Sequence, residues 1–327
     1  MDRREMTMAK SIFVSITSFC DPHLQFTLDG LFSTASDPTR LHVVVIDQSV
    51  DDNQSWIAAH PWANQVQYIQ FHPAHSRGCS WARSIAFSCF REEDFLLQID
   101  SHTSFDPAWD DKLIDELSFL LTLTPKAILT AYPPPFEFDE NAQPFKTLVP
   151  AQTVYWMQPN PGQTLREGDL TLTFRAEHVF QADFVIGHHI AGGLLFTTGD
   201  FIHDVPYDPY MYFHGDEQNI TIRAFTRGWT IYNPMHDNIP LYHLYRTAGI
   251  AHPTQHWRED YEQHRVVKRT ELEASARRRL CELVYGKRGD QPFGLGRIAT
   301  VADFAQQSGI NYLERTIQYV PPIIVHR

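Results

Sequence analysis

Four short apolar runs, rich in β-branched residues, stand out in the first hundred positions of the chain. They cover residues 11–17, 41–46, 66–71 and 94–99, and three of them stop abruptly at polar side chains. Runs of this length and composition are typical of buried strands, although the run at 66–71 is weaker than the others. The pattern therefore predicts four strands within the first third of the chain.

Segments with helical spacing lie between these strands. The first opens at Asp21 and Pro22, with Asp as the predicted cap and Pro in the first turn, and runs to about Ala35. The second covers residues 80–90. This order of strands and helices predicts an α/β fold with an open, mostly parallel sheet flanked by helices. In such sheets ligands bind at the carboxyl ends of the strands, which is where the polar stops fall.

The remainder of the chain is less regular. Residues 137–180 form a Pro- and Gln-containing excursion with strand-like pieces such as 170–174, and the sequence leaves open whether it is a lid over an acceptor site. Residues 184–196 are rich in small side chains. The other expected elements are a helix at 110–123, a strand at 126–130, charged helical sequence at 255–285 and a final helix with an extended end after 297.

Length and linkers bear on the domain organisation. A chain of 327 residues suits one large α/β domain or two small ones, and no linker is long enough to require a division. We therefore expect a disordered extension at 1–10, followed by a single domain over 11–327.

Charge and composition exclude several classes of protein. Lys and Arg number 27 against 39 Asp and Glu, a formal net charge of −12, which argues against a nucleic-acid partner. No run of about 18 apolar residues predicts a membrane span. The polar, charged first ten residues are unlike a secretory signal. Four scattered cysteines without a CxxC pair favour a reduced, cytoplasmic location over a disulfide framework.

The sharpest candidate for chemistry is Asp100, followed two residues later by His102, directly after the strand at 94–99. Both side chains can turn toward one point, and a divalent ion such as manganese accepts this mixed carboxylate and imidazole set. The alternative is an ordinary strand end with a solvent-facing Asp and His. His243 could supply a third ligand, although the chain has 17 histidines. Other histidines compete for that role: His188, His189, His214 and His236.

Two further motifs place charged side chains beside a glycine. Arg77 and Arg83 flank a Gly-containing turn that enters a helix, where backbone N–H groups and two guanidinium groups could hold an anion. A plain helix start with solvated arginines is an equal alternative. Asp216 and Glu217 follow another glycine and could bind sugar hydroxyls or face a developing oxocarbenium ion. The acidic first turn of a helix explains this pair equally well.

The order of these motifs resembles glycosyltransferase family 60, the family of the cytoplasmic Skp1 hydroxyproline N-acetylglucosaminyltransferases. The matching segments extend over nearly the whole chain: Ile12–Ser18 with Asp21 and Pro22, Gly78–Arg83, Gln98–His102 with Phe105, Trp109 and Asp110, Ile128–Pro133, Val205–Pro209, Gly215–Glu217, Thr226–Trp229, Tyr232 and Pro234, His243–Arg246, and Leu295–Arg297. Several of these segments are weak individually, but their joint order is hard to obtain by chance.

The resemblance implies a GT-A fold, with a nucleotide-binding half at about 11–135 and an acceptor-side half at about 136–327. It also implies UDP-N-acetylglucosamine (UDP-GlcNAc) as donor and a divalent metal, Mn²⁺ or Mg²⁺, held by Asp100, His102 and His243. It places Ser15, Thr17, Ser18 and Asp47 near the uridine of the donor, and Arg77 and Arg83 near the donor as a whole. Through the ion, Asp100 would lie next to the diphosphate. Asp216 and Glu217 would be the catalytic pair near the reacting sugar. One departure is Cys20, which stands where the family usually has Arg.

Together these expectations describe a metal-dependent, retaining transferase that moves N-acetylglucosamine from UDP-GlcNAc to a hydroxyl of a protein or glycan. No enclosed nucleophile is evident, so we expect front-face attack assisted by the leaving phosphate. Two alternatives remain open. A non-catalytic nucleotide-sugar or carbohydrate-binding protein could use the 7 Trp and 13 Tyr as stacking platforms. A metal-dependent hydrolase could use the same Asp and His residues on phosphate esters.

Overall fold

The computed structural model of the protein describes residues 10–147, 149–245, 255–289 and 291–327. The predicted N-terminal extension lies outside these residues except for Lys10, and Arg246 of one matching segment also lies outside them. Across the described ranges, no helix combines the length and apolar character that a bilayer crossing requires.

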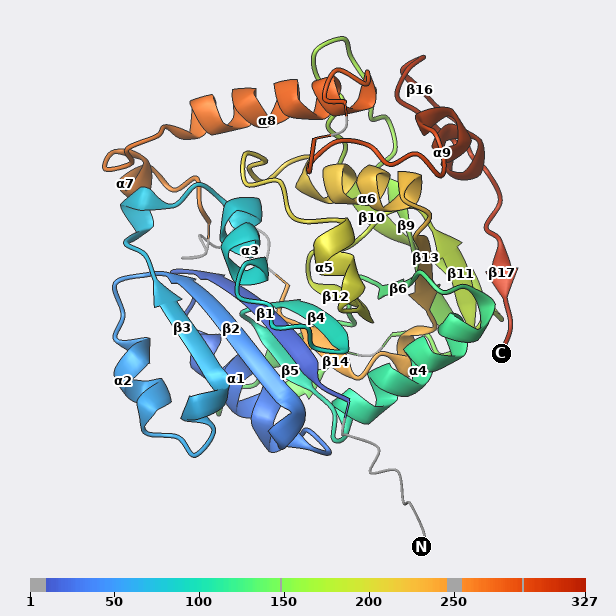
Figure 1. The fold of residues 1–327 in the computed structure, drawn as a ribbon. Coiled ribbons are helices and arrows are strands. Elements are labelled where there is room, and N and C mark those ends of the chain that lie inside the picture. The colour runs from blue at the N-terminus through green and yellow to red at the C-terminus, as the bar shows by residue number, and fades with distance from the viewer. Residues whose placement is uncertain (1–9, 148, 246–254, 290) are drawn as a thin grey trace, which may run out of the picture.

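One large sheet forms the centre of the fold (Figure 1). Within the described residues it has nine strands, which in chain order are β1 Ile12–Phe19, β2 Leu41–Gln48, β3 Val66–Gln70, β4 Phe95–Asp100, β6 Ala127–Thr130, β11 Phe184–Gly187, β12 Leu194–Thr198, β13 Thr230–Pro234 and β17 Ile324–Val325. Their order across the sheet is β17-β11-β13-β6-β12-β4-β1-β2-β3. Seven of these nine described strands run in one direction, and β11 and β12 run against their neighbours. The predicted α/β fold with a mostly parallel sheet is confirmed.

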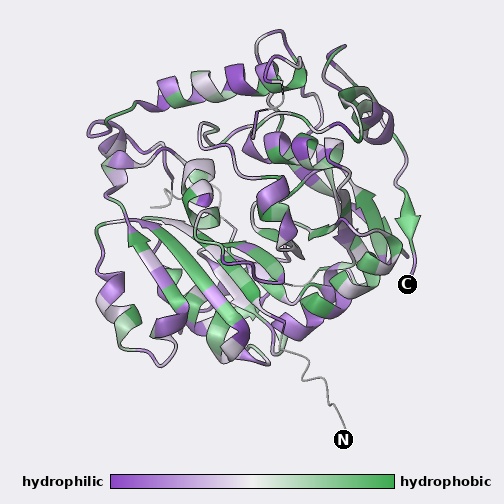
Figure 2. Cartoon of the chain, in the orientation of Figure 1, coloured by the Kyte–Doolittle hydropathy of each residue, from purple (hydrophilic) through white to green (hydrophobic). Residues whose placement is uncertain are grey.

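Helices cover both faces of the sheet, because successive strand residues point to opposite sides. The helices are α1 Leu24–Ser33, α2 Asn53–Ala58, α3 Cys79–Phe87, α4 Trp109–Leu123, α5 Asp200–Asp204, α6 Asp216–Thr226, α7 Glu259–Glu262, α8 Arg269–Val284 and α9 Val301–Ser308. Val14 of β1 packs in a core with α1 and α4, whereas its neighbour Phe13 packs in a second core with α3, α5 and α6. In Figure 2 the strands are mainly hydrophobic, and hydrophilic residues recur along the covering helices.

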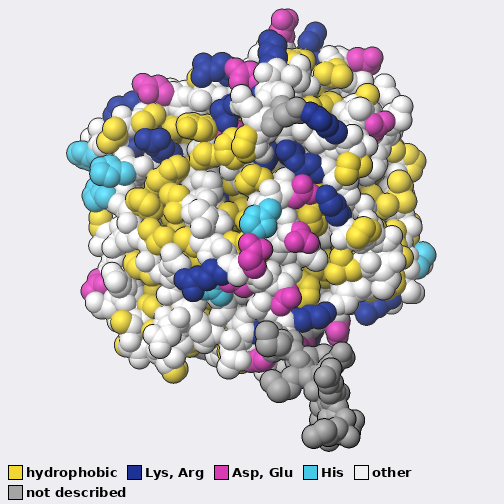
Figure 3. All heavy atoms as spheres, in the orientation of Figure 1, with side chains coloured by type: hydrophobic (Ala, Val, Ile, Leu, Met, Phe, Trp, Pro, Cys, Tyr) yellow, Lys and Arg dark blue, Asp and Glu magenta, His cyan; other side chains and the backbone are white. Residues whose placement is uncertain are grey.

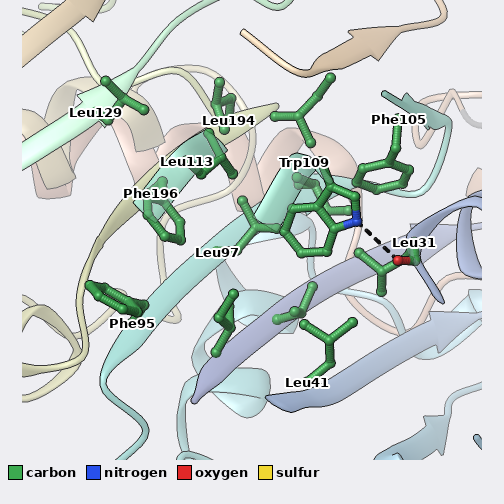
Figure 4. Packing of buried hydrophobic residues seen from close by; sticks show 14 of the residues in the cluster. Leu31, Leu41, Phe95, Leu97, Phe105, Trp109, Leu113, Leu129, Leu194 and Phe196 are labelled. Carbon is green, nitrogen blue, oxygen red and sulfur yellow. Dashed lines mark hydrogen bonds between the residues drawn. The ribbon is translucent and has the colours of Figure 1, made fainter. Parts of the chain in front are cut away.

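Trp109 joins α4 to α1 beneath the sheet (Figure 4). Its side chain is fully buried, and its indole N–H donates to the carbonyl oxygen of Leu31 at 3.0 Å. The ring of Phe105 lies 5.4 Å from the Trp109 ring. Because a buried indole needs this partner, the hydrogen bond and the ring packing together fix the chain between β4 and α4. The polar residues that follow β4 are held by this packing.

Outside the large sheet, short strands pair in twos: β5 Thr103–Phe105 with β14 Leu241–His243, β7 Phe136–Phe138 with β8 Pro144–Lys146, β9 Thr153–Pro159 with β10 Phe174–Phe180, and β15 Ile310–Asn311 with β16 Thr316–Ile317. The strand predicted at 170–174 is instead a loop that leads into β10. Gln218, at the start of α6, donates to the Leu170 carbonyl at 3.0 Å and accepts from the Leu172 N–H at 2.7 Å. The backbone of this loop is therefore bound to α6 rather than to another strand.

The structure adds detail to two other predicted segments. The small-residue segment at 184–196 contributes β11 and the start of β12, and β12 lies inside the sheet between β6 and β4. The charged sequence at 255–285, which was predicted to be helical, forms the two helices α7 and α8. Arg269 and Glu273, four residues apart on α8, form a 3.3 Å ion pair. Figure 3 shows the same intermingling of basic and acidic side chains around α8, at the top of the view.

Candidate active site

The predicted site residues converge on a cavity of about 530 Å³ at the carboxyl ends of β1 and β4. The first turns of α3 and α6 form another part of its wall. Eight of the predicted residues line it: Thr17, Ser18, Arg83, Asp100, His102, Asp216, Glu217 and His243. A cavity of this size at the end of an open sheet is where ligands bind in α/β proteins.

Asp100, His102 and His243 form a cluster whose ligand atoms all lie within 4.8 Å of one another. Asp100 is the last residue of β4, and His102 lies two residues further along the chain. His243 reaches them because β14 pairs antiparallel with β5, with His243 opposite Thr103. The pairing of two three-residue strands thus brings the third side chain to the first two across 140 positions of sequence.

The donor set suits a divalent ion. One carboxylate and two imidazoles are ligands that manganese accepts. Nε2 of His243 lies 3.1 Å from Oδ2 of Asp100. Adjacent ligands of an octahedral ion with bonds of about 2.1 Å are separated by about 3.0 Å, so this spacing fits shared coordination as well as a hydrogen bond.

Asp21 orients His102 from behind. Its fully buried carboxylate lies 2.6 Å from Nδ1 of His102 and accepts the Ser101 hydroxyl and the His23 N–H. Because the Nδ1 proton of His102 is directed at Asp21, Nε2 is the nitrogen of His102 that would bind a metal. We predicted Asp21 to be a helix cap, and that was wrong: α1 begins three residues later, at Leu24, because the carboxylate is committed to these partners.

The charges around Asp100 keep it ionised. Burial by itself would raise the pKa of this carboxyl. The hydrogen bond from His243 and the positive charge of Arg83 are among the influences that outweigh burial, so the pKa of Asp100 lies below its ordinary value. For His243, burial dominates and lowers the pKa despite the opposing effect of Asp100, which favours the neutral imidazole that binds metals.

Arg83 connects this cluster to the acidic pair. The guanidinium group is buried and lies 3.1 Å from Asp216 Oδ2 and 3.5 Å from Asp100 Oδ1. It also donates to the Gly192 carbonyl at 3.3 Å. The alternative of a solvated arginine is therefore wrong for Arg83. Gly192 itself is required by this contact, because a Cβ there would lie 2.6 Å from Nη2 of Arg83.

Asp216 and Glu217 occupy the acidic first turn of α6, as one alternative proposed, and both also line the cavity. Burial raises the pKa of Asp216, against the lowering effect of Arg83. Burial would also raise the pKa of Glu217, but the hydrogen bond from His189, the Gly192 N–H and Arg83 outweigh it, and the pKa is lowered. Neighbouring carboxyls with pKa values shifted in opposite directions are typical of active sites.

Three predicted residues lie outside the cavity lining. Ser15 is buried within β1, two residues before Thr17. Asp47 is buried at the end of β2, where its Oδ2 accepts three hydrogen bonds. The donors are Ser49, Asn53 and Tyr68. Arg77 is exposed and lines a second cavity of about 500 Å³ beside Trp81. It diverges from Arg83 because Gly78, at φ +99°, turns the chain between them.

Several residues that line the cavity were not predicted from the sequence. Cys79 lines the cavity and donates from Sγ to Asp216 Oδ2 at 3.1 Å. His256 and Trp257 line it from the segment before α7, and His256 is held by Tyr212 and Ser76 at 2.5 and 2.6 Å. No local pattern marks these positions, because they depend on contacts between segments more than 40 residues apart. His189, weighed only as a metal ligand, instead lies 3.0 Å from Glu217.

A solved structure shares the overall fold of this chain. The crystal structure of GalNAc-T7 with UDP, GalNAc and Mn²⁺ aligns at a TM-score of 0.56 and 15% identity, over 90% of this chain and 54% of that one. This chain thus spans about half the length of that protein. Two structures of S. aureus TarS align less closely. TarS 1-349 has a TM-score of 0.45 and 15% identity, over 72% of this chain and 60% of that one. Its complex with UDP-GlcNAc has a TM-score of 0.44 and 14% identity, over 78% of this chain and 64% of that one.

The fold is the GT-A fold of glycosyltransferases, and the cavity lies at the carboxyl ends of β1 and β4. The sequence profile of the Glycosyltransferase (GlcNAc) family matches residues 11–61 and 58–313, which together span nearly all of the chain. The protein belongs to this family. No curated protein matches it in sequence.

Proposed function

We propose that the protein is a metal-dependent, retaining glycosyltransferase that transfers N-acetylglucosamine from UDP-GlcNAc to a hydroxyl group on a protein. The observation that carries the proposal is the meeting of Asp100, His102 and His243 with the Asp216–Glu217 pair in one cavity of about 530 Å³. Membership of the Glycosyltransferase (GlcNAc) family supports a sugar-transfer reaction. The complexes of GalNAc-T7 with UDP, GalNAc and Mn²⁺ and of TarS with UDP-GlcNAc are consistent with this donor class.

The residues of the chain have distinct parts in the proposed reaction. A divalent ion held by Asp100, His102 and His243 would supply neutralisation of the charge that develops on the departing diphosphate. Thr17 and Ser18, at the end of β1, line the part of the cavity nearest β2 and are proposed to face the uridine. Asp47 would support that wall from within the sheet, through its hydrogen bonds to Ser49, Asn53 and Tyr68.

The bond changes follow from retention. The acceptor oxygen forms its bond to the anomeric carbon on the face from which the diphosphate departs, and the acceptor proton passes to the departing phosphate oxygen. Glu217, ionised and facing the cavity, would stabilise the developing cation or orient the attacking hydroxyl. Arg83 keeps Asp216 and Asp100 in place rather than gripping the phosphates, because its Nη1 and Nη2 atoms are already directed at these carboxylates and the Gly192 carbonyl.

The finer assignments belong to the same proposal. Within this framework we place the chain near glycosyltransferase family 60, on the ordered segments of the sequence. We propose one domain over 11–327, since both halves contribute to one sheet and β6 of the first half lies between β13 and β12 of the second. A cytoplasmic location is supported by four cysteines that are all free.

UDP release tests the proposal. The purified protein is incubated with Mn²⁺ and, separately, UDP-GlcNAc, UDP-GalNAc and UDP-glucose, and the UDP formed is measured. We expect release from UDP-GlcNAc above the other donors, its loss with EDTA, and its loss in Asp100→Ala with an unchanged fold. Full activity of Asp100→Ala in EDTA would show that the metal assignment is wrong.

Two further measurements separate the alternatives. A non-catalytic binder would bind UDP-GlcNAc without releasing UDP. A hydrolase would release UDP but leave no sugar on another molecule, so transfer of labelled N-acetylglucosamine to protein is the decisive observation. The anomeric configuration of the product, read by NMR, decides whether the transfer retains configuration.

A further inference from the structure

Glu217 is held at two points while the rest of its carboxylate faces the cavity. Oε1 accepts the Gly192 N–H at 2.7 Å, and Oε2 lies 3.0 Å from Nε2 of His189. The Glu217 side chain is 32% exposed, against 6% for Asp216. A carboxylate has about four lone-pair sites, so about two remain for a ligand in the cavity.

Asp216 is turned to other partners. Its Oδ2 accepts from Arg83 Nη1 at 3.1 Å, from Cys79 Sγ at 3.1 Å and from Ser80 Oγ at 3.4 Å. All three donors come from α3, so Asp216 joins α6 to α3. The two adjacent carboxylates therefore differ in role: Asp216 is bound within the protein, and Glu217 is presented to the cavity.

His189 is fixed independently of Glu217. Its side chain is 1% exposed, and its ring stacks on Phe174 of β10 with ring centres 3.7 Å apart and an interplanar angle of 15°. Its Nδ1 atom is buried and has no hydrogen-bond partner among the described residues. The neutral tautomer with the proton on Nε2 suits these surroundings, because the N–H donates to Glu217 and no N–H is buried without an acceptor. We assign this tautomer from the hydrogen-bond network.

We propose that His189 is a positioning residue, which holds the Glu217 carboxylate so that its open lone pairs accept a hydrogen bond from a substrate hydroxyl. This inference rests on the function proposed above and deepens it. The stack on Phe174 also gives the excursion at 137–180 a part in the reaction, since it fixes the face of the imidazole whose Nε2 edge contacts Glu217. The hydroxyl belongs either to the acceptor or to the donor sugar, and the two are separated by experiment.

The ionised state of Glu217 depends on several neighbours. Removing the His189 donor takes away the principal influence that lowers the pKa of Glu217. The acid limb of the profile of kcat against pH should therefore move to higher pH. The charged and titratable groups that face Glu217 from the surrounding elements are His189, Asp216, Arg83, Cys79, Tyr132 and Tyr245. These other groups are unchanged in a His189 variant, so a shift of the limb reports on His189.

The test compares two substitutions of one residue. His189→Phe keeps an aromatic ring on Phe174 and removes the donor, whereas His189→Gln keeps an N–H near the position of Nε2. We expect kcat for UDP release from UDP-GlcNAc with Mn²⁺ to fall about 10- to 100-fold in His189→Phe. KM for UDP-GlcNAc should stay within threefold, and the acid limb should shift upward. His189→Gln should recover most of the rate and return the limb toward that of the wild type.

A matched control is His236→Phe. His236 is also buried, stacks on Tyr155 and bonds the Thr153 carbonyl at 2.8 Å, but it does not line the cavity. This variant should keep kcat and the pH profile. If His189→Phe fails to fold, Phe174→Leu removes the stack alone and should lower kcat in the same direction.

Two comparisons identify the mechanism and the hydroxyl. In a Glu217→Gln background, His189→Phe should cause no further loss of rate if His189 acts through Glu217. Hydrolysis with water is then compared with transfer to a pool of peptides containing serine, threonine and hydroxyproline. A loss confined to transfer assigns the hydroxyl to the acceptor, and an equal loss in both assigns it to the donor sugar.

Failure of the inference is distinguishable from failure of the proposed function. A kcat of His189→Phe within twofold of the wild type, or a loss additive with Glu217→Gln, overturns the inference. The carboxyl pKa of Glu217 is also followed by ¹³C NMR, assigned with Glu217→Gln, because this reading needs no turnover. An upward shift in His189→Phe supports the inference even if the wild type releases no UDP, which would refute the proposed function alone. An unchanged pKa overturns the inference.

Discussion

The buried carboxylate of Asp21 offers the most direct test of the metal cluster, because it can be changed without touching a ligand. In the wild type it accepts from His102, Ser101 and His23. Asp21→Asn keeps the shape but places an NH₂ group near one of these donors. If that group faces His102, the imidazole must carry its proton on Nε2, the nitrogen that a metal would take.

The magnitude follows from what such supporting residues do in metal sites. Loss of the carboxylate behind a ligating histidine typically weakens metal affinity about 10- to 100-fold, or about 1.4 to 2.7 kcal/mol. We therefore expect the Mn²⁺ concentration at half-maximal UDP release to rise by this factor in Asp21→Asn. The maximal rate at saturating Mn²⁺ should stay within a few-fold of the wild type, because the ligands themselves remain.

The assay is a Mn²⁺ titration at saturating UDP-GlcNAc, with Mn²⁺ binding measured separately by calorimetry. Asp208→Asn is the matched control, since Asp208 is equally buried, pairs with Arg279 at 2.7 Å and lies away from the cavity lining. Thermal unfolding without metal verifies that both variants fold. An unchanged Mn²⁺ midpoint in folded Asp21→Asn would refute the reasoning, as would a rate loss that excess Mn²⁺ does not relieve.

Three further outcomes are expected. Gly192→Ala should lower kcat about 10-fold or more, measured by UDP release, because its Cβ would lie 2.6 Å from Arg83 and displace a buried guanidinium that has little room to move. Arg83→Met should leave Asp216 without its ion pair and raise its pKa further, so that stability falls more steeply as the pH rises through neutrality, as followed by melting profiles. Trp109→Ala should lower the free energy of unfolding by about 3–5 kcal/mol in urea denaturation, because a fully buried indole and its hydrogen bond to Leu31 are lost.

The sign of the Arg83 prediction follows from linkage. Burial already raises the folded-state pKa of Asp216 above its unfolded value, so ionisation opposes folding as the pH rises. Without Arg83 this effect is larger and extends to higher pH. A variant with melting temperatures that do not depend on pH between 5 and 8 would contradict it.

The amino-acid sequence determined the main strands of the first hundred residues. The runs at 11–17, 41–46 and 94–99 became β1, β2 and β4, because strands of a parallel sheet are buried on both faces and are therefore apolar along their length. The sequence also placed Asp100 and His102 at a strand end, since chain neighbours stay neighbours in any fold. These inferences needed only local pattern and spacing.

Only the tertiary structure decided the rest of the cavity. His243 is one of 17 histidines, and its place beside Asp100 depends on the pairing of β14 with β5, two strands too short to be recognised from their own residues. Likewise, Arg77 and Arg83 look equivalent along the chain, yet one is exposed in another cavity and the other is buried between two carboxylates. Such contacts join segments far apart in the chain, so local periodicity carries no record of them.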